Sequence, residues 1–447
     1  MKNRIFTAIS VVMLFAVIFS GCSLPDFFAA ENLIRPPKLT GENAALQQVF
    51  ENTVGKDISL YSPVSGNHRA SYIFFDANSD SVDEAVVFYS LNSNSSVVHM
   101  HLLSQKNGEW FSVFDVIGSG TEVYKVDFYN VDNLKNLEIA VIWSVEDSKR
   151  EKTLSVYKIA SLDSSVDNAL VSIATIQIAD YVYFDVDSDK SNELLYLYYN
   201  SSEQTYSLNA RLLDFDSAEK AFVPLSDIAF NSLVSSISDI LYESDGKELR
   251  IYLECISPDN EMFTEILVFS KELGTLFIPQ PENTVLSELT ARRNFISCTD
   301  FNEDGFLDIP IPVEIEGSYV ISEDDNSEAP VLIEWMTFSD GEFTTLGKYF
   351  INEKDSFALK LDDFVRYHYI VYDQVNNIVQ VRLRDSADEN NIVFSVSAEK
   401  SEENTGILIG DGFLGHRNDR EFNITVTALG ESLYVTEEFI ESLIKDL

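Results

Sequence analysis

An acidic loop recurs along this chain at nearly constant spacing and constrains the fold more than any other feature. Its most complete copy, DFNEDGFLD at residues 300–308, carries oxygen-bearing side chains at loop positions one, three, five and nine. Two good copies span residues 76–84 and 185–193, and two worn copies end at Glu138 and Glu248. The ninth positions therefore lie 54, 55, 55 and 60 residues apart. Such a period predicts a series of similar supersecondary units.

Runs rich in Val, Ile, Tyr and Phe flank the loops, as β-strands do. They occupy residues 71–75, 123–128, 181–184 and 295–299 before the loops, and 85–89, 139–143, 194–199 and 249–253 after them. Two further candidates complete a unit, for example 97–103 with 110–116, and 155–159 with 170–176. Four strands in about 55 residues predict a mainly β fold, a β-propeller of about five four-stranded blades, or up to seven if flanking strands complete more.

Shorter modules flank the repeats. Thr40 is expected to cap a short N-terminal helix that presents Leu46, Val49, Phe50 and Val54 on one face and ends at Gly55. After the repeats, strands are expected at 365–372, 378–383, 392–398 and 421–428. A helix capped by Thr436 and carrying Phe439, Leu443 and Ile444 then completes a small C-terminal α+β module.

The first residues predict export. Lys2 and Arg4 precede an apolar run of about fifteen residues, shorter than the ~20 that a spanning helix needs. The run ends in Phe-Ser-Gly-Cys22, which resembles the lipobox of bacterial lipoproteins, where the cysteine is acylated and becomes the mature N-terminus. We therefore expect a signal peptide at 1–21, a tether at 22–40, a helix and strand at 41–66, propeller repeats at 67–350 and the C-terminal module at 351–447. The protein would be anchored by lipid at Cys22 on the outer face of the bacterial cytoplasmic membrane, at the cell surface.

From about residue 69 to 349 the loops and their strands resemble FG-GAP and VCBS-type repeats, whose blades carry a calcium loop between the first two strands. The Phe-Gly and Gly-Ala-Pro marks of integrin-type repeats are absent. The lipobox, the proline-rich tether and the C-terminal module together resemble lipoproteins of clostridial-type bacteria. This resemblance implies a surface protein with structural calcium.

Calcium takes six to eight oxygen ligands, so alternating acidic side chains and one main-chain carbonyl on a tight loop suit it. An Asx-rich turn without metal is the alternative interpretation. The candidate ligands are Asp300, Asn302, Asp304, Asp308 and the Phe306 carbonyl; Asp76, Asn78, Asp80, Glu84 and the Val82 carbonyl; and Asp185, Asp187, Asp189, Glu193 and the Ser191 carbonyl.

The net charge of the chain limits the classes of molecule that it could bind. A net charge of −42 argues against nucleic acid, because binding a polyanion needs a cationic surface. We expect a binding module for a polysaccharide, a peptidoglycan fragment or a protein. The alternatives are a polysaccharide-active extracellular enzyme and an envelope assembly factor.

No nucleophile elbow, zinc-protease helix or nucleotide fingerprint is present, and we therefore expect the chain not to be an enzyme. His99 and His101 alternate along one strand and are expected to be surface residues. Any of Trp110, Trp143 and Trp335 could form an exposed sugar platform. Cys255 and Cys298 could pair as a disulfide or stay as two buried thiols.

Overall fold

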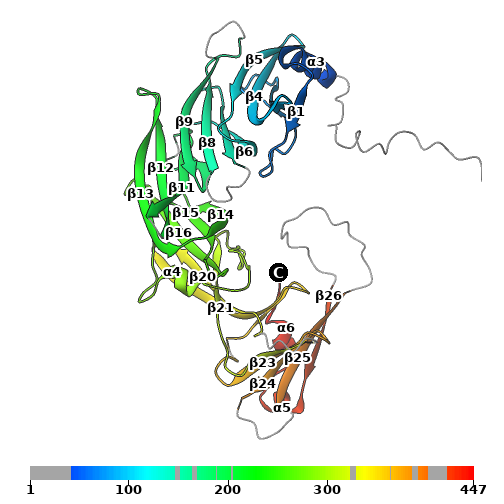
Figure 1. Cartoon of the computed structure of the whole chain (residues 1–447). Helices are drawn as coiled ribbons and strands as arrows, with labels where there is room; N and C mark the ends of the chain where they lie inside the picture. The colour runs from blue at the N-terminus through cyan, green and yellow to red at the C-terminus, as the bar shows by residue number, and fades with distance from the viewer. Residues whose placement is uncertain are drawn as a thin grey trace, which may run out of the picture. The chain divides into compact units, whose positions relative to one another are not determined.

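The structure is a computed structural model that describes residues 42–145, 152–163, 169–187, 189–202, 205–322, 329–362, 364–384, 391–400 and 420–447. Within these ranges the chain is mainly β, and its strands form six sheets of four or five strands (Figure 1). The expected signal peptide, Cys22, the tether and Thr40 lie outside the described residues. A search of the described helices finds none with the length and apolarity needed to cross a membrane.

Five of the six sheets have the strand order of a propeller blade. In the first, β1 (Ile58–Tyr61) and β2 (Tyr72–Phe75) pair with successive halves of one edge of β3 (Glu84–Leu91), followed by β4 (Asn94–Lys106) and β5 (Glu109–Ile117). The next three sheets are antiparallel meanders. The second contains β6 (Glu122–Tyr129), β7 (Glu138–Ser144), β8 (Lys152–Ile159) and β9 (Leu170–Ile178), and the third contains β10 (Asp180–Phe184), β11 (Glu193–Ser202), β12 (Thr205–Asp216) and β13 (Ala221–Leu233). The fourth contains β14 (Ser236–Ser244), β15 (Glu248–Ile256), β16 (Met262–Ser270) and β17 (Thr275–Phe277). The fifth orders β18 (Asp308–Pro312), β20 (Leu332–Ser339), β21 (Glu342–Asn352), β22 (Phe357–Lys360) and β27 (Ile444–Asp446).

The predicted mainly β fold of four-stranded, propeller-type blades is confirmed. In the first four sheets the acidic loop joins the two strands that open the blade, as expected. The strands that follow the loops are buried on both faces; every residue of β7 is buried, and every residue of β3 except its last. Continuous apolar runs suit such strands, because neither face meets water.

The strand predicted at 295–299 is wrong. Only Thr299 pairs, through an isolated bridge to Asp308, and Phe295 is exposed. The amide of Cys298 donates instead to the Glu254 carboxylate at 2.6 Å, so it is not free for a ladder. A short helix, α4 (Leu286–Leu289), lies in the preceding segment.

The N-terminal helix α3 (Glu42–Val54) forms as predicted, with Leu46 and Phe50 fully buried. Gly55 follows in the left-handed region (φ +95°) and donates its amide to the Glu51 carbonyl, which ends the helix. The Phe50 ring packs edge-on against Tyr72, Tyr89 and His101. Helix α3 therefore covers one face of the first sheet.

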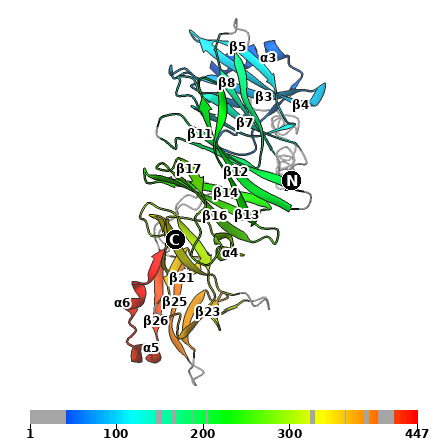
Figure 2. The same cartoon turned by 90° about the vertical axis from the view of Figure 1, so that its left-hand side faces the viewer.

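The C-terminal module is α+β, as predicted. Its sheet orders β19 (Tyr319–Ile321), β23 (His368–Asp373), β24 (Ile378–Leu383), β25 (Ile392–Lys400) and β26 (Arg420–Val426). Helices α5 (Ala428–Ser432) and α6 (Glu437–Glu441) lie beside β25 and β26 (Figure 2).

Thr436 caps α6, since its hydroxyl accepts the amide of Phe439 at 3.1 Å. The helix is shorter than predicted: it buries Ile440, and Ile444 belongs to β27. Because β27 pairs with β22, the end of the chain joins the fifth blade.

The described residues divide into two compact units, one drawn from 42–128, 135–145 and 155–172, and the other from 129–134, 152–154 and 173–447. The first holds a core around Val86, Phe88 and Trp143. The second holds separate cores within the later sheets and the C-terminal module. The domain boundary expected at residue 350 falls within β21.

Candidate metal centre

The acid at loop position nine is buried in each of the three complete loops. Glu84, Glu193 and Asp308 each open the strand after the loop and are at most 1% exposed. Each accepts the main-chain amide of position two, from Ala77 at 2.9 Å, Val186 at 2.7 Å and Phe301 at 2.9 Å. The repeated acid therefore closes the loop by holding its second residue.

Positions one and five shape the rest of the loop identically. In the loop at 300–308, Asp300 accepts the amides of Asp304 and Gly305, each at 2.9 Å, and Asp304 accepts the amide of Phe306 at 2.9 Å. The same three bonds occur in the loop at 76–84 and in the loop at 185–193. These loops share one backbone conformation, which the spacing of their acids selects.

Position six needs a left-handed backbone. It is Gly305 in the most complete loop (φ +91°), Ser81 in the first (φ +67°) and Lys190 in the third (φ +79°). A side chain makes this conformation costly, by roughly 1–2 kcal/mol. Ser81 and Lys190 adopt it nonetheless, so lack of glycine does not prevent the two loops from taking the same turn.

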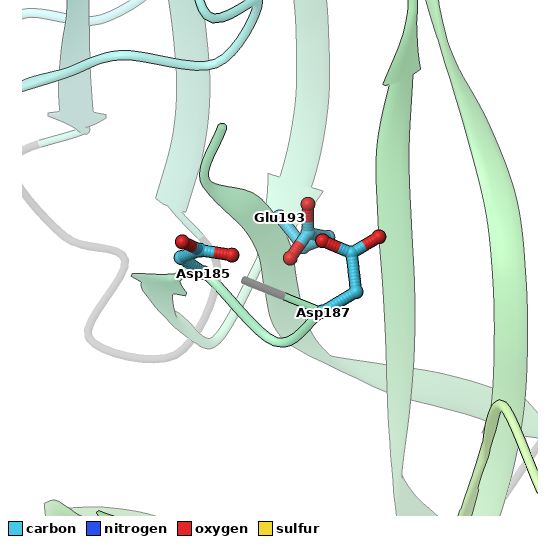
Figure 3. Close-up of side chains that lie close together, drawn as sticks. All are labelled: Asp185, Asp187 and Glu193. Carbon is cyan, nitrogen blue, oxygen red and sulfur yellow. The ribbon is translucent and has the colours of Figure 1, made fainter. Parts of the chain in front are cut away.

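Three carboxylates converge in the loop at 185–193. Asp185, Asp187 and Glu193 each offer a ligand atom, and these atoms all lie within 4.8 Å of one another (Figure 3). Asp185 and Asp187 are exposed, whereas Glu193 forms the buried floor. Oxygen atoms at this separation suit a hard cation such as calcium.

The described part of the chain gives these carboxylates no cationic partner. Among the described residues, no ion pair involves the acids at positions one, three, five or nine of the three complete loops. Burial and the nearby charges of Asp187, Asp214 and Asp189 raise the pKa of Glu193 to about 8. Burial also raises the pKa of Glu84 and of Asp308. A bound cation would favour the ionised form of these groups, because a nearby opposite charge lowers the pKa of a carboxyl.

Glu193 makes the stability of the metal-free chain depend on pH. Its carboxyl keeps its proton up to about pH 8 when folded but releases it near 4.5 when unfolded, so the unfolded state binds fewer protons between these values. The free energy of unfolding should therefore fall as pH rises from 4.5 to 8. Urea unfolding at several pH values, in metal-free buffer, measures the slope. Glu193→Gln should flatten it, and equal slopes in both proteins would contradict this account.

The worn loop that ends at Glu248 carries its own cation. Arg250, with a side chain only 1% exposed, lies 2.6 Å from Asp245, 3.5 Å from Glu243 and 3.6 Å from Glu248. Glu243 also accepts the amide of Leu307 in the next loop. Glu243, which pairs with this guanidinium, therefore links the fourth blade to the loop at 300–308.

Asp245 shows the effect of that guanidinium. Burial opposes its ionisation, but the amides of Glu248 and Lys247 and the Arg250 side chain outweigh burial and lower the pKa of Asp245 to about 2. The role of Arg250 as the cation of this loop was not predicted, although the sequence distinguishes this copy from the others. The residues two positions after the ninth acid in the other copies are uncharged: Val86, Ala140, Leu195 and Pro310.

The other worn loop keeps part of the turn. The amide of Leu134 donates to the Asp132 carboxylate at 3.0 Å, and the Asn130 side chain donates to the Leu134 carbonyl at 2.9 Å. Leu134 itself is exposed and brings no ligand atom to position five.

Burial decides between the interpretations of the remaining candidate residues, which are histidines, tryptophans and cysteines. His101 is 1% exposed, so the prediction that it lies on the surface is wrong: α3 covers it. Trp143 and Trp335 are buried in cores and cannot form sugar platforms, whereas Trp110 is half-buried against Phe74. Cys255 and Cys298 are free, buried thiols.

No protein-family model matches this chain, and no curated protein matches it. Solved structures do match. A hypothetical selenium-binding protein from Sulfolobus tokodaii is 12% identical over 52% of this chain and 58% of its own, with a TM-score of 0.30. An alpha-L-arabinofuranosidase from Lactobacillus brevis is 9% identical over 64% of this chain and 92% of its own (TM-score 0.27). An endo-arabinase from Bacteroides thetaiotaomicron is 14% identical over 64% of this chain and 100% of its own (TM-score 0.26).

These matches correct one prediction. The chain was expected not to be an enzyme, and the structures that resemble it include an arabinofuranosidase, an endo-arabinase and a family-43 glycoside hydrolase, which contradicts that expectation. At TM-scores this low, no substrate or catalytic residue of those proteins is transferred to this chain.

Proposed function

We propose that this chain is a calcium-stabilised blade-repeat protein that is exported, anchored by lipid and active on a polysaccharide of the cell envelope or its surroundings. The observation that carries the calcium part is the common geometry of the three complete loops. Each holds its turn with carboxylates at positions one and five and buries an acid at position nine.

The donor set fits calcium. Each loop offers carboxylate or amide oxygens at positions one, three, five and nine, and the carbonyls of Val82, Ser191 and Phe306 would add one main-chain ligand each. The fourth blade gives the converse case, because Arg250 supplies positive charge where the ligand set is incomplete. The resemblance to FG-GAP and VCBS-type loops supports the same assignment.

The proposal of a polysaccharide substrate is supported by the ligand that the sequence predicts, which lies in the cell envelope or beyond it. The glycoside hydrolase names reported above favour an enzyme over a module that only binds. Loops that face solvent between blade strands are suited to ligand recognition. The same preparation can test binding and cleavage together.

The test uses the soluble chain from residue 23 onward with a panel of polysaccharides and purified peptidoglycan, with calcium and with chelator. Retention on one polymer measures binding, and new reducing ends measure cleavage. We expect both to need calcium. Asp189→Ala should weaken them, whereas Asp216→Ala, which removes a similar exposed turn bond outside the metal loops, should not. A folded protein that retains and cleaves no polymer would overturn the polysaccharide assignment.

Cys22→Ser should move the protein from the membrane fraction to the soluble fraction of the producing bacterium. The serine cannot form the thioether of a lipoprotein, and a single apolar run of about fifteen residues is too short to span the bilayer stably. Fractionation with immunoblotting measures the distribution. Ser23→Ala is a matched control that leaves the cysteine intact. Continued membrane retention of Cys22→Ser would show a different anchor.

A further inference from the structure

The first sheet contains a hydrogen-bonded line of serine, histidine and aspartate that the metal loops do not use. Ser112 Oγ lies 2.9 Å from His101 Nε2, and His101 Nδ1 lies 2.9 Å from Asp115 Oδ2. The hydroxyl and the carboxylate therefore meet opposite nitrogens of one imidazole. This is the relation of nucleophile, base and orienting acid in serine-dependent acyl transfer.

A β-bulge creates this arrangement. Ser112 and Asp115 are three residues apart on β5, so strict alternation would place their side chains on opposite faces. The register with β4 shifts between the pairs Leu102–Phe114 and Leu103–Ser112, which leaves Val113 as the extra residue. Val113 and Phe114 both join the core on the far face, and Ser112 and Asp115 reach the face that carries His101. Bulges re-aim side chains in this way.

The carboxylate sets the orientation of the imidazole. Asp115 accepts hydrogen bonds from His101, from His99 at 2.8 Å and from the Tyr89 hydroxyl at 2.8 Å. Burial opposes ionisation of Asp115, but these bonds outweigh it and lower its pKa, so the group stays charged. An ionised carboxylate only accepts, so His101 Nδ1 carries a proton, and neutral His101 presents the lone pair of Nε2 to Ser112.

Burial separates the base from water, whereas the nucleophile is less deeply buried. His101 is 1% exposed beneath the Phe50 ring of α3, whose centroid lies 5.4 Å away. Ser112 is half-buried, and the Asp115 side chain is 34% exposed. Burial, together with the charge of Glu51 on α3, raises the pKa of Tyr72, whose ring also packs edge-on against Phe50.

We propose that Ser112 is a nucleophile for small carboxylic esters, with His101 as its general base and Asp115 as the residue that positions His101. Ser112 Oγ attacks the ester carbonyl carbon while its proton passes to His101 Nε2. The bond to the alcohol oxygen then breaks, and the alcohol leaves with that proton. Water attacks the acyl-serine, gives its proton to His101 Nε2, and the carboxylic acid leaves as Ser112 regains the proton. This inference does not depend on the metal loops or on a polysaccharide ligand.

The test uses the mature chain, loaded with calcium, and a fluorophosphonate probe that phosphonylates activated serines. Peptide mass spectrometry locates the adduct, and hydrolysis of p-nitrophenyl acetate gives the rate. We expect an adduct on Ser112. Ser112→Ala should abolish it, and His101→Gln should slow labelling by roughly 100-fold or more, the usual contribution of a general base.

Ser119→Ala is the matched control, because Ser119 is an exposed serine whose hydroxyl lies 3.1 Å from that of Ser155 and, within the described ranges, has no histidine partner. It should label like the wild type. If the variant at the buried His101 does not fold, Ser112→Thr serves as a second variant, because it keeps a hydroxyl at position 112. Wild-type protein that is folded but unlabelled, an adduct on another residue, or full labelling of Ser112→Ala would each overturn the proposal. A lowered melting temperature of Ser112→Ala without wild-type labelling would assign the network to anchoring α3.

Discussion

Calcium should raise the melting temperature of the mature chain by several degrees, and a chelator should reverse the rise. Each loop that binds the ion only when folded adds about 2.7 kcal/mol at a hundredfold excess of free ion over its dissociation constant. The gain comes from neutralising carboxylates that repel one another, as Asp187 and Asp189 do around Glu193. Differential scanning fluorimetry across a calcium titration measures it. An identical melt with calcium and with chelator would discard the metal assignment.

Single loop variants separate metal binding from turn stability. Asp304→Ala and Asp189→Ala each remove a position-five ligand and should each reduce the calcium-dependent part of the shift. Asp216→Ala is the matched control, because Asp216 accepts the amides of Ala218 and Glu219 in an exposed turn without the other ligand positions. It should lower the melting temperature equally with and without calcium. A calcium shift that survives unchanged when the three position-five residues, Asp80, Asp189 and Asp304, are all replaced by alanine would place the ion elsewhere.

Arg250→Met should destabilise the chain by about 3–5 kcal/mol, the usual cost of removing one partner from a buried ion pair. The substitution keeps most of the apolar volume but leaves Glu243, Asp245 and Glu248 without their shared positive charge. Glu243 also accepts bonds from Tyr252 and Leu307, so the loss should spread to the fifth loop. Urea unfolding followed by tryptophan fluorescence measures the change.

Arg211→Met is the matched control for that substitution. Arg211 pairs with Asp227 at 2.7 Å, but its side chain is 37% exposed and that of Asp227 is 50% exposed. An exposed pair of this kind contributes about 0–1 kcal/mol. Adding Asp245→Asn to Arg250→Met should recover part of the lost stability, because one unpaired charge is removed. Equal effects of the two arginine variants would show that Arg250 is not acting through its buried charges.

Much of the fold was predictable from local pattern. The strand Ile378–Leu383 was predicted at its observed bounds, and the Thr436 cap and the Gly55 stop lie where the sequence placed them. The acidic loops were located because their turn is built from bonds between residues two to seven positions apart. The segment at 295–299 failed because Glu254, 44 residues from Cys298, takes its amide.

The candidate sites, like the fold, were predictable from the sequence only in part. The amino-acid sequence by itself determined which loops carry the alternating oxygen-bearing side chains, since spacing and residue type are local properties. Only the tertiary structure decided that Glu193 is buried beside Asp187, that Arg250 serves as the cation of the fourth blade, and that Ser112, His101 and Asp115 lie in one line. The physical reason is that these relations depend on strand register, on a bulge and on burial, which arise only when residues distant in the chain pack together.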